Sequence, residues 1–323
     1  MAICIDGNVV CFGGGCFCQT PTGISFTGEA LADNFVDCRA PGGYGTISGY
    51  SSGGSPSPYN NIIDKFPFAS DGNATDVGDL TQGRENASGQ SSDSSGYTSG
   101  GNVSTIDKFP FASDSNATDV GELTRTCSQL AGQSSRDCGY ASGGGVPITT
   151  TIDKFPFASD SNATDVGELT QCRQELMGQS STDSGYSSGG TTPPYRNTVD
   201  KFPFASDGNA TDVGNLTDAR SISAGQSSDA SGYVSGGDSP GIVNTIDKFP
   251  FSSDSNATDV GELTVGRYMI AGQSSDASGY TSGGFDGGSN RDIIDKFPFA
   301  SDSSATDVGD LTVTRRAHVG QQV

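Results

Sequence analysis

Few residues of this chain can do chemistry, and His318 is the only histidine among its 323 residues. General-base catalysis and most transition-metal sites depend on histidine. A pair of carboxylates could act as in a glycosidase, but the acidic residues recur at the same positions along the chain, as scaffold residues do. We therefore predict that the protein is not an enzyme.

The acidic segment Ser-Asp-Ser-Asn-Ala-Thr-Asp offers a possible metal site. In one copy, Asp160, Asn162 and Asp165 could supply oxygen ligands to calcium, although the glycine and the closing glutamate of an EF-hand loop are missing. The alternative is a β-turn whose Asp and Asn side chains bind their own backbone. The same segment carries formal N-glycosylation signals at Asn73, Asn116, Asn162, Asn209 and Asn256.

Eight cysteines are spread unevenly, at positions 4, 11, 16, 18, 38, 127, 138 and 172. They could be free and buried, or they could form disulfides, for which Cys4–Cys11 and Cys127–Cys138 are the candidate pairs. A zinc site is the third alternative, but no Cys-x-x-Cys pair is present and His318 lies far away in sequence.

These residues are carried by a repeat. The hexapeptide IDKFPF, or VDKFPF in one copy, begins at residues 63, 106, 152, 199, 246 and 294, at intervals of 43, 46, 47, 47 and 48 residues. Each copy contains the same short apolar runs between turn-forming residues, in the order IDKFPF, DVGEL, Arg, GQSS and GYxSGG. Such spacing indicates about four short β-strands per copy, which is one propeller blade.

Written from its glycines, a copy resembles the kelch repeat: a strand, Gly-Gly, an aromatic strand, a turn, a short outer strand, an arginine and an innermost strand. The outer strand carries Val where kelch repeats carry Trp, and the chain has no Trp. The resemblance implies an all-β β-propeller of four-stranded blades. Ile24 follows Gly13-Gly14 at the spacing of the repeat, and Arg39 lies where the repeat arginine belongs, so we expect seven blades that fill residues 1–323 as one domain. Residues of about 1–42 would form a degenerate first blade, and about 43–323 would form six near-identical repeats.

Ring closure is expected to use both ends of the chain. The C-terminal residues 315–323 contain the arginine and the beginning of a GQSS-like strand. We expect this strand to lie innermost in the first blade, beside or in place of an N-terminal strand, because an open ring would leave two sheet edges unpaired.

The net charge of −21 restricts the partners. All six lysines belong to DKF units, so no free basic patch remains for nucleic acid or for an anionic membrane. The sequence contains no run of 18 apolar residues that would predict a membrane span. The N-terminus lacks the basic region of a signal peptide. We expect each DKF lysine to be partly buried near a carboxylate of its own or a neighbouring blade.

The loops that differ between copies predict where a partner binds. The loop after each Gly-Gly and the link between blades should share one face, whereas the near-invariant turns should share the other. Aromatic residues and arginines in the variable loops are typical binding anchors: Tyr59, Tyr195, Arg196, Tyr268, Phe285 and Arg291. Neutral drift of unconstrained loops is the alternative explanation.

Near-identical tandem copies, acidity and richness in Ser, Gly and Thr resemble kelch-like proteins of phage or other virions. This resemblance implies a virion-surface, fibre or tail-appendage protein, located on the virion or outside the cell. Its partners would be other virion proteins or a host surface glycan or protein, in an arrangement that could be symmetric. The alternatives are a kelch-type protein-interaction adaptor and a secreted lectin-like module. No cofactor is expected apart from the calcium alternative.

Overall fold

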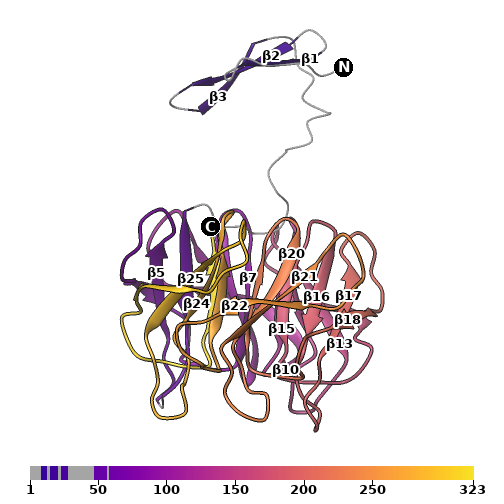
Figure 1. Cartoon of the computed structure of the whole chain (residues 1–323). Coiled ribbons are helices and arrows are strands. Elements are labelled where there is room, and N and C mark those ends of the chain that lie inside the picture. The colour runs from indigo at the N-terminus through magenta and orange to yellow at the C-terminus, as the bar shows by residue number, and fades with distance from the viewer. Residues whose placement is uncertain (1–8, 13–14, 21–22, 28–46, 57) are drawn as a thin grey trace. The chain divides into compact units, whose positions relative to one another are not determined.

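A computed structural model describes residues 9–12, 15–20, 23–27, 47–56 and 58–323, and the regular elements in these ranges are all β-strands (Figure 1). The chain separates into two compact units, Met1–Arg39 and Ala40–Val323, which are considered separately below. No helix in the described ranges is long and apolar enough to cross a membrane.

The first unit contains a three-stranded antiparallel sheet of β1 (Val9–Phe12), β2 (Gly15–Thr20) and β3 (Gly23–Thr27). The prediction of a seven-bladed ring with residues 1–42 as a degenerate first blade is therefore wrong. The spacing between Gly13-Gly14 and Ile24 matches that of the repeat, but residues 1–42 lack the DKF aspartate and the GQS strand. Both features connect neighbouring blades in the ring.

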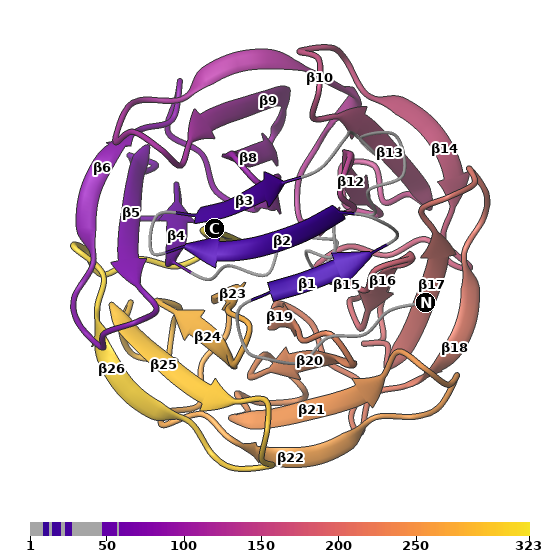
Figure 2. The same cartoon turned by 90° about the horizontal axis from the view of Figure 1, so that it is seen from above.

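The second unit is a β-propeller of six four-stranded antiparallel blades. Seen from above, β6, β10, β14, β18, β22 and β26 form the outer edge of the ring (Figure 2). From the innermost to the outermost strand, the blades are as follows: blade 1, β27 (Val319–Gln322), β4 (Ser48–Ser52), β5 (Ile62–Pro67) and β6 (Thr75–Asp79); blade 2, β7 (Ala87–Ser91), β8 (Ser95–Gly100), β9 (Val103–Pro110) and β10 (Thr118–Cys127); blade 3, β11 (Ala131–Ser134), β12 (Cys138–Ser142), β13 (Thr151–Pro156) and β14 (Thr164–Glu168); blade 4, β15 (Met177–Ser180), β16 (Ser184–Ser188), β17 (Thr198–Pro203) and β18 (Thr211–Asn215); blade 5, β19 (Ala224–Ser227), β20 (Ser231–Ser235), β21 (Thr245–Pro250) and β22 (Thr258–Glu262); blade 6, β23 (Ala271–Ser274), β24 (Ser278–Ser282), β25 (Ile293–Pro298) and β26 (Thr306–Asp310).

The ring closes in blade 1, where β27 pairs antiparallel with β4 and Gln321 lies opposite Tyr50. The expected closure involved an N-terminal strand from the degenerate blade. Instead, the C-terminal strand supplies the innermost strand of the first regular repeat, so six copies of DKFPF make six blades.

The six innermost strands pack backbone against backbone at the centre. A Cβ atom at Gly178 would lie 2.0 Å from the carbonyl oxygen of Gly132 in the neighbouring blade, so only glycine fits there. Each adjacent glutamine side chain joins two blades, as when Gln133 Nε2 donates to the Tyr186 carbonyl oxygen at 2.9 Å. The GQS sequence is thus a consequence of crowding at the axis.

Aromatic side chains fill the space between blades. Tyr140 of blade 3 stacks on Phe204 of blade 4, with ring centroids 4.8 Å apart, and lies 5.6 Å from Phe202. Val166 of the DVGEL strand is partly buried against the same cluster. The sheets therefore pack on one another without tryptophan.

At five of the six junctions between blades, a buried ion pair joins the link to the blade that follows it. The Asp200 carboxylate in β17 is fully buried and accepts hydrogen bonds from the Thr170 backbone N–H and hydroxyl group at 3.0 and 2.7 Å. Arg173 Nη2 lies 2.8 Å from the same carboxylate. The corresponding pairs are Arg84–Asp107, Arg220–Asp247, Arg267–Asp295 and Arg315–Asp64.

One junction departs from this pattern, because Cys127 occupies the arginine position before blade 3. Arg125, two residues earlier, donates instead to the Gly143 carbonyl oxygen at 3.1 Å. Burial raises the pKa of Asp153, the aspartate of this junction, although Thr124 still donates to it.

The DKF lysines are partly buried and pair with a neighbouring blade, as expected, but the aspartate of each pair is exposed. Lys154 Nζ lies 2.9 Å from an Asp207 carboxylate oxygen, with 27% of the lysine side chain and 59% of the aspartate side chain exposed. Five further pairs repeat this contact, at 2.9 to 3.4 Å: Lys65–Asp114, Lys108–Asp160, Lys201–Asp254, Lys248–Asp302 and Lys296–Asp71.

Replacing Lys154 with methionine is therefore expected to change the free energy of unfolding by about 0–1 kcal/mol, the range for exposed ion pairs. Urea denaturation of the full chain measures this change. A loss of several kcal/mol would mean that the lysine pairs hold the blades together more strongly than their exposure indicates.

Candidate binding site at one end of the ring

The two variable connections lie on the same face of the propeller. Isolated bridges join the loop between the second and third strands of a blade to the link that enters the blade, as at Gln174–Thr191, Ser221–Asp238 and Tyr268–Phe285. We call this face, formed by the Gly-Gly loops and the links, the variable rim.

Five of the six residues predicted as binding anchors are half-buried in contacts within this rim. Tyr195 donates its hydroxyl hydrogen to the Asp238 carboxylate at 2.5 Å, which connects blades 4 and 5 and raises the pKa of Tyr195 to about 12. Tyr268 packs edge-to-face on Phe285, with centroids 5.6 Å apart. Thus the structure brings together Tyr268 and Phe285 from the predicted set.

The remaining predicted anchors are placed differently. Arg291 forms an ion pair with Asp286 of its own loop. The Arg196 backbone N–H donates to the Gly190 carbonyl oxygen at 2.9 Å. Only Tyr59 is strongly exposed, at 47% of its surface.

Six link residues, one before each innermost strand, form a ring that the sequence reasoning did not single out. Their backbones are left-handed, with φ between +50° and +62°, although none is glycine. Each backbone N–H donates to the carbonyl oxygen of the preceding member at 2.6 to 3.1 Å, and the six bonds close on themselves. We call this the axial ring: Asn86, Gln129, Glu175, Ile222, Met269 and Ala317.

The buried arginines position this ring. Each axial-ring residue follows, by two positions, the residue at the arginine site, as Glu175 follows Arg173. Arg173 also donates to the Gly189 and Thr198 carbonyl oxygens at 2.8 Å, so it fixes the link on blade 4. The scaffold therefore holds six variable side chains in equivalent places.

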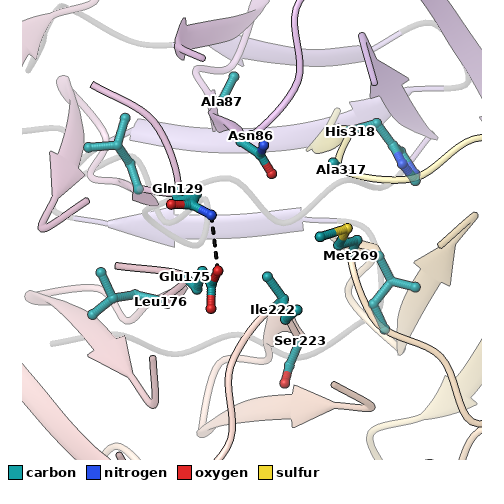
Figure 3. A pocket seen from close by; sticks show the side chains of 12 residues that line it. Asn86, Ala87, Gln129, Glu175, Leu176, Ile222, Ser223, Met269, Ala317 and His318 are labelled. Carbon is teal, nitrogen blue, oxygen red and sulfur yellow. Dashed lines mark hydrogen bonds between the residues drawn. The ribbon is translucent and has the colours of Figure 1, made fainter. Parts of the chain in front are cut away.

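The axial ring surrounds an open cavity with about 400 Å³ of empty space, which we call the axial mouth. The side chains of Asn86, Gln129 and Glu175 occupy one side of it, and those of Ile222 and Met269 occupy the other (Figure 3). Leu130, Leu176 and Ile270 also line the cavity. Around the axial ring, three consecutive members are thus polar and the next three are apolar, although the blades that carry them are nearly identical.

Glu175 is the only acidic or basic residue in the axial ring. One carboxylate oxygen accepts a hydrogen bond from Gln129 Nε2 at 3.0 Å, and the other accepts one from the Ser221 hydroxyl group at 2.9 Å (Figure 3 shows the first). Burial raises the pKa of Glu175 because it disfavours the charged form, and the Asp238 carboxylate adds to this shift.

The innermost strands also line a second cavity, and its lining is uniform. It is formed by Gly, Gln and Ser residues from all six blades. Because the lining repeats with each blade, this cavity offers little basis for distinguishing one ligand from another.

The oxygens that could have bound calcium are used within the protein, two of them by the neighbouring blade and one by the same strand. Asp160 accepts from Lys108 Nζ, Asn162 from the Glu122 backbone N–H, and Asp165 from the Gly167 backbone N–H, at 3.0 to 3.2 Å. Within the described ranges, no group of three His, Cys, Asp or Glu residues is arranged to hold a metal ion.

Of the alternatives left open for Cys127 and Cys138, the disulfide is not formed, because both thiols are free. Cys127 ends β10 next to the link and Cys138 begins β12, so strand β11 separates the two residues. Burial raises the pKa of the Cys127 thiol to about 11. For the other predicted pair, Cys4 lies outside the described residues, as does the side chain of Cys11.

The fold and site define a six-bladed β-propeller of four-stranded blades with an asymmetric mouth on its axis, consistent with a kelch-like propeller. No protein-family model matches the chain, and no curated protein is significantly similar to it.

The axial ring left one signal in the sequence. When the links are aligned on the innermost strand, the position three residues before the Gly of its Gly-Gln pair changes from copy to copy. The Gly-Gln pair itself does not change, and the residue two positions before the variable one is arginine in five of the six copies. The binding anchors were predicted from aromatic residues and arginines. This position was not among them because Asn, Gln, Ile and Met are not the residue types most enriched at binding anchors.

Proposed function

We propose that the protein is a non-enzymatic binding propeller that holds its partner on the variable rim, with the axial mouth as the selective site. The asymmetry of the axial ring carries this proposal. Six positions that the repeat makes equivalent hold six different side chains, sorted into a polar and an apolar half. Concave, partly apolar cavities with a few convergent polar groups are the usual form of ligand sites.

The setting that fits best with the acidic, repetitive sequence is a virion surface, fibre or tail appendage, outside the cell, that binds host glycan or other virion proteins. Copurification of the chain with virus particles supports this setting, and its consistent absence from particles contradicts it. A kelch-type adaptor or a secreted lectin-like module is the alternative, because the variable rim also suits a protein partner.

The proposed site is tested by probing glycan and peptide arrays with the full chain and with rim variants. Met269→Gln, a residue that the equivalent position already carries as Gln129, and Tyr195→Ala with Arg196→Ala are expected to weaken the array signals at least about tenfold, since each side chain lies on the variable rim. The control, Asp160→Ala with Asp165→Ala, alters the opposite rim and should leave the signals unchanged. Loss on the control and not on the rim variants would show that the partner binds the opposite face.

A further inference from the structure

The axial mouth carries a negative charge that the protein does not neutralise. Both Glu175 oxygens accept hydrogen bonds from neutral donors, Gln129 and Ser221. Within residues 47–56 and 58–323, no Lys or Arg forms an ion pair with Glu175, whereas the buried aspartate of the same blade, Asp200, has Arg173. A partly buried carboxylate without a cation is unfavourable.

The groups around Glu175 do not supply the missing positive charge. The one charged side chain that shifts the pKa of Glu175 is Asp238, which is also an acid and raises that pKa. Tyr195 donates to Asp238 and is neutral. His318, which also lines the mouth, is held neutral because burial lowers its pKa well below the usual value. The position therefore favours a ligand that brings positive charge.

The hydrogen-bonding capacity left at the mouth also fits a donor. A carboxylate has about four lone-pair sites, and two of those on Glu175 are in use, so it can accept further bonds. An ammonium group has three N–H donors and no acceptor. Ile222 and Met269 on the facing side are half-buried and offer apolar surface to a short aliphatic chain.

We propose, building on the proposed function, that the axial mouth binds a primary ammonium group on a short alkyl chain, with the ammonium at Glu175 and the alkyl chain against Ile222 and Met269. A lysine side chain of a protein partner and a free aliphatic amine share this chemistry. Anionic ligands are disfavoured by the net charge of −21, and a neutral sugar would leave Glu175 without a counter-charge.

The test uses the full chain and n-butylammonium chloride, which reproduces the lysine side chain, with 1-butanol as the neutral analogue of similar size. NMR titration at constant ionic strength follows the methyl group of Met269. We expect butylammonium to bind at least about tenfold more tightly than butanol. Glu175→Gln should reduce butylammonium affinity about tenfold or more and leave butanol binding unchanged, because the equivalent Gln129 shows that the backbone accepts glutamine.

Glu168→Gln is the matched control, since Glu168 is an exposed acid on the outer strand of blade 3. An equal loss in Glu168→Gln and Glu175→Gln would mean unspecific attraction to an acidic protein and would overturn the inference. Equal binding of butanol and butylammonium, or no binding of either, would also overturn it. These outcomes leave the proposed function to be judged by the array experiment, whose rim variants do not depend on the amine.

A second titration, with Nα-acetyl-lysine methylamide, distinguishes a lysine of a protein partner from a free amine as the source of the ammonium group. Binding at least as tight as that of butylammonium supports the proposal with a lysine of a protein partner as the occupant. Clearly weaker binding supports it with a free amine as the occupant, because the peptide backbone then hinders entry.

Discussion

Replacing Asp200 with alanine is expected to destabilise the propeller by about 3–5 kcal/mol, the cost of removing one partner of a buried ion pair. Asp200 and Arg173 are both fully buried and lie 2.8 Å apart. The substitution leaves the guanidinium group without its carboxylate and leaves the Thr170 donors without their acceptor. Urea denaturation, read as the shift in midpoint at constant slope, measures the loss.

The matched control is Asp207→Ala, seven residues later in the same blade. Asp207 pairs with Lys154 but is 59% exposed, so its removal should cost only about 0–1 kcal/mol. A double variant with Arg173→Met and Asp200→Leu should recover much of the lost stability, because it removes both charges together. Similar small losses for Asp200→Ala and Asp207→Ala would show that the buried pair does not hold the link to the blade.

The DKF unit shows how much of the fold the sequence predicts. Its period and its flanking strands predicted an all-β propeller with four strands per blade, and the structure has these blades. The roles of its two charged residues could not be separated by pattern alone, since Asp and Lys recur equally. The alternation of side chains along the strand separates the two roles. Asp200 points between blades toward Arg173, whereas Lys201 reaches the surface.

The number of blades was missed because the first repeat is split between the two ends of the sequence. The strand Val319–Gln322 reads GQQ where other copies read GQS, and its partner begins at Ser48. The first blade was counted from Gly13-Gly14, Ile24, Phe26 and Arg39, which lie at roughly the spacing of the repeat. The buried Asp, Thr and Arg set is a stricter criterion, because each member contacts the adjacent blade.

The sequence predicted which face of the propeller carries the candidate site, but not the axial ring on that face. The alternation of hairpins placed the Gly-Gly loops and the links on one rim, and the isolated bridges show them together. The axial ring depends on left-handed backbones at Glu175 and its equivalents, and on a closed circle of hydrogen bonds. A sequence does not display such a conformation when residues other than glycine adopt it.

Lowering the pH below about 6.5 is expected to destabilise the propeller through His318. The imidazole group of His318 is buried at the junction between blades 6 and 1, which closes the propeller. Its Nε2 atom lies 3.4 Å from the Ser282 hydroxyl oxygen. Burial is the main reason that its pKa in the folded protein lies well below 6.5, and the Arg315 and Arg267 charges lower it further. In the unfolded chain the imidazole titrates near 6.5.

The sign follows from proton linkage. Between the two pKa values the unfolded chain binds more protons than the folded protein, so stability rises with pH there and is lost as the pH falls. One such group contributes a slope of at most about 1.4 kcal/mol per pH unit, and therefore up to about 3 kcal/mol between pH 6.5 and 4.5. Unfolding free energies from urea titrations across this range measure the slope.

His318→Leu separates this histidine from the carboxylates that titrate in the same range. Leu130 and Leu176 occupy the equivalent position in other blades, so leucine fits the site between blades. The variant should match the wild type or exceed it in stability at low pH, and its stability should depend less steeply on pH between 6.5 and 4.5. Identical slopes for the two proteins would mean that His318 accepts a proton in the folded state. The junction between blades 6 and 1 would then have to open or rearrange without unfolding the ring.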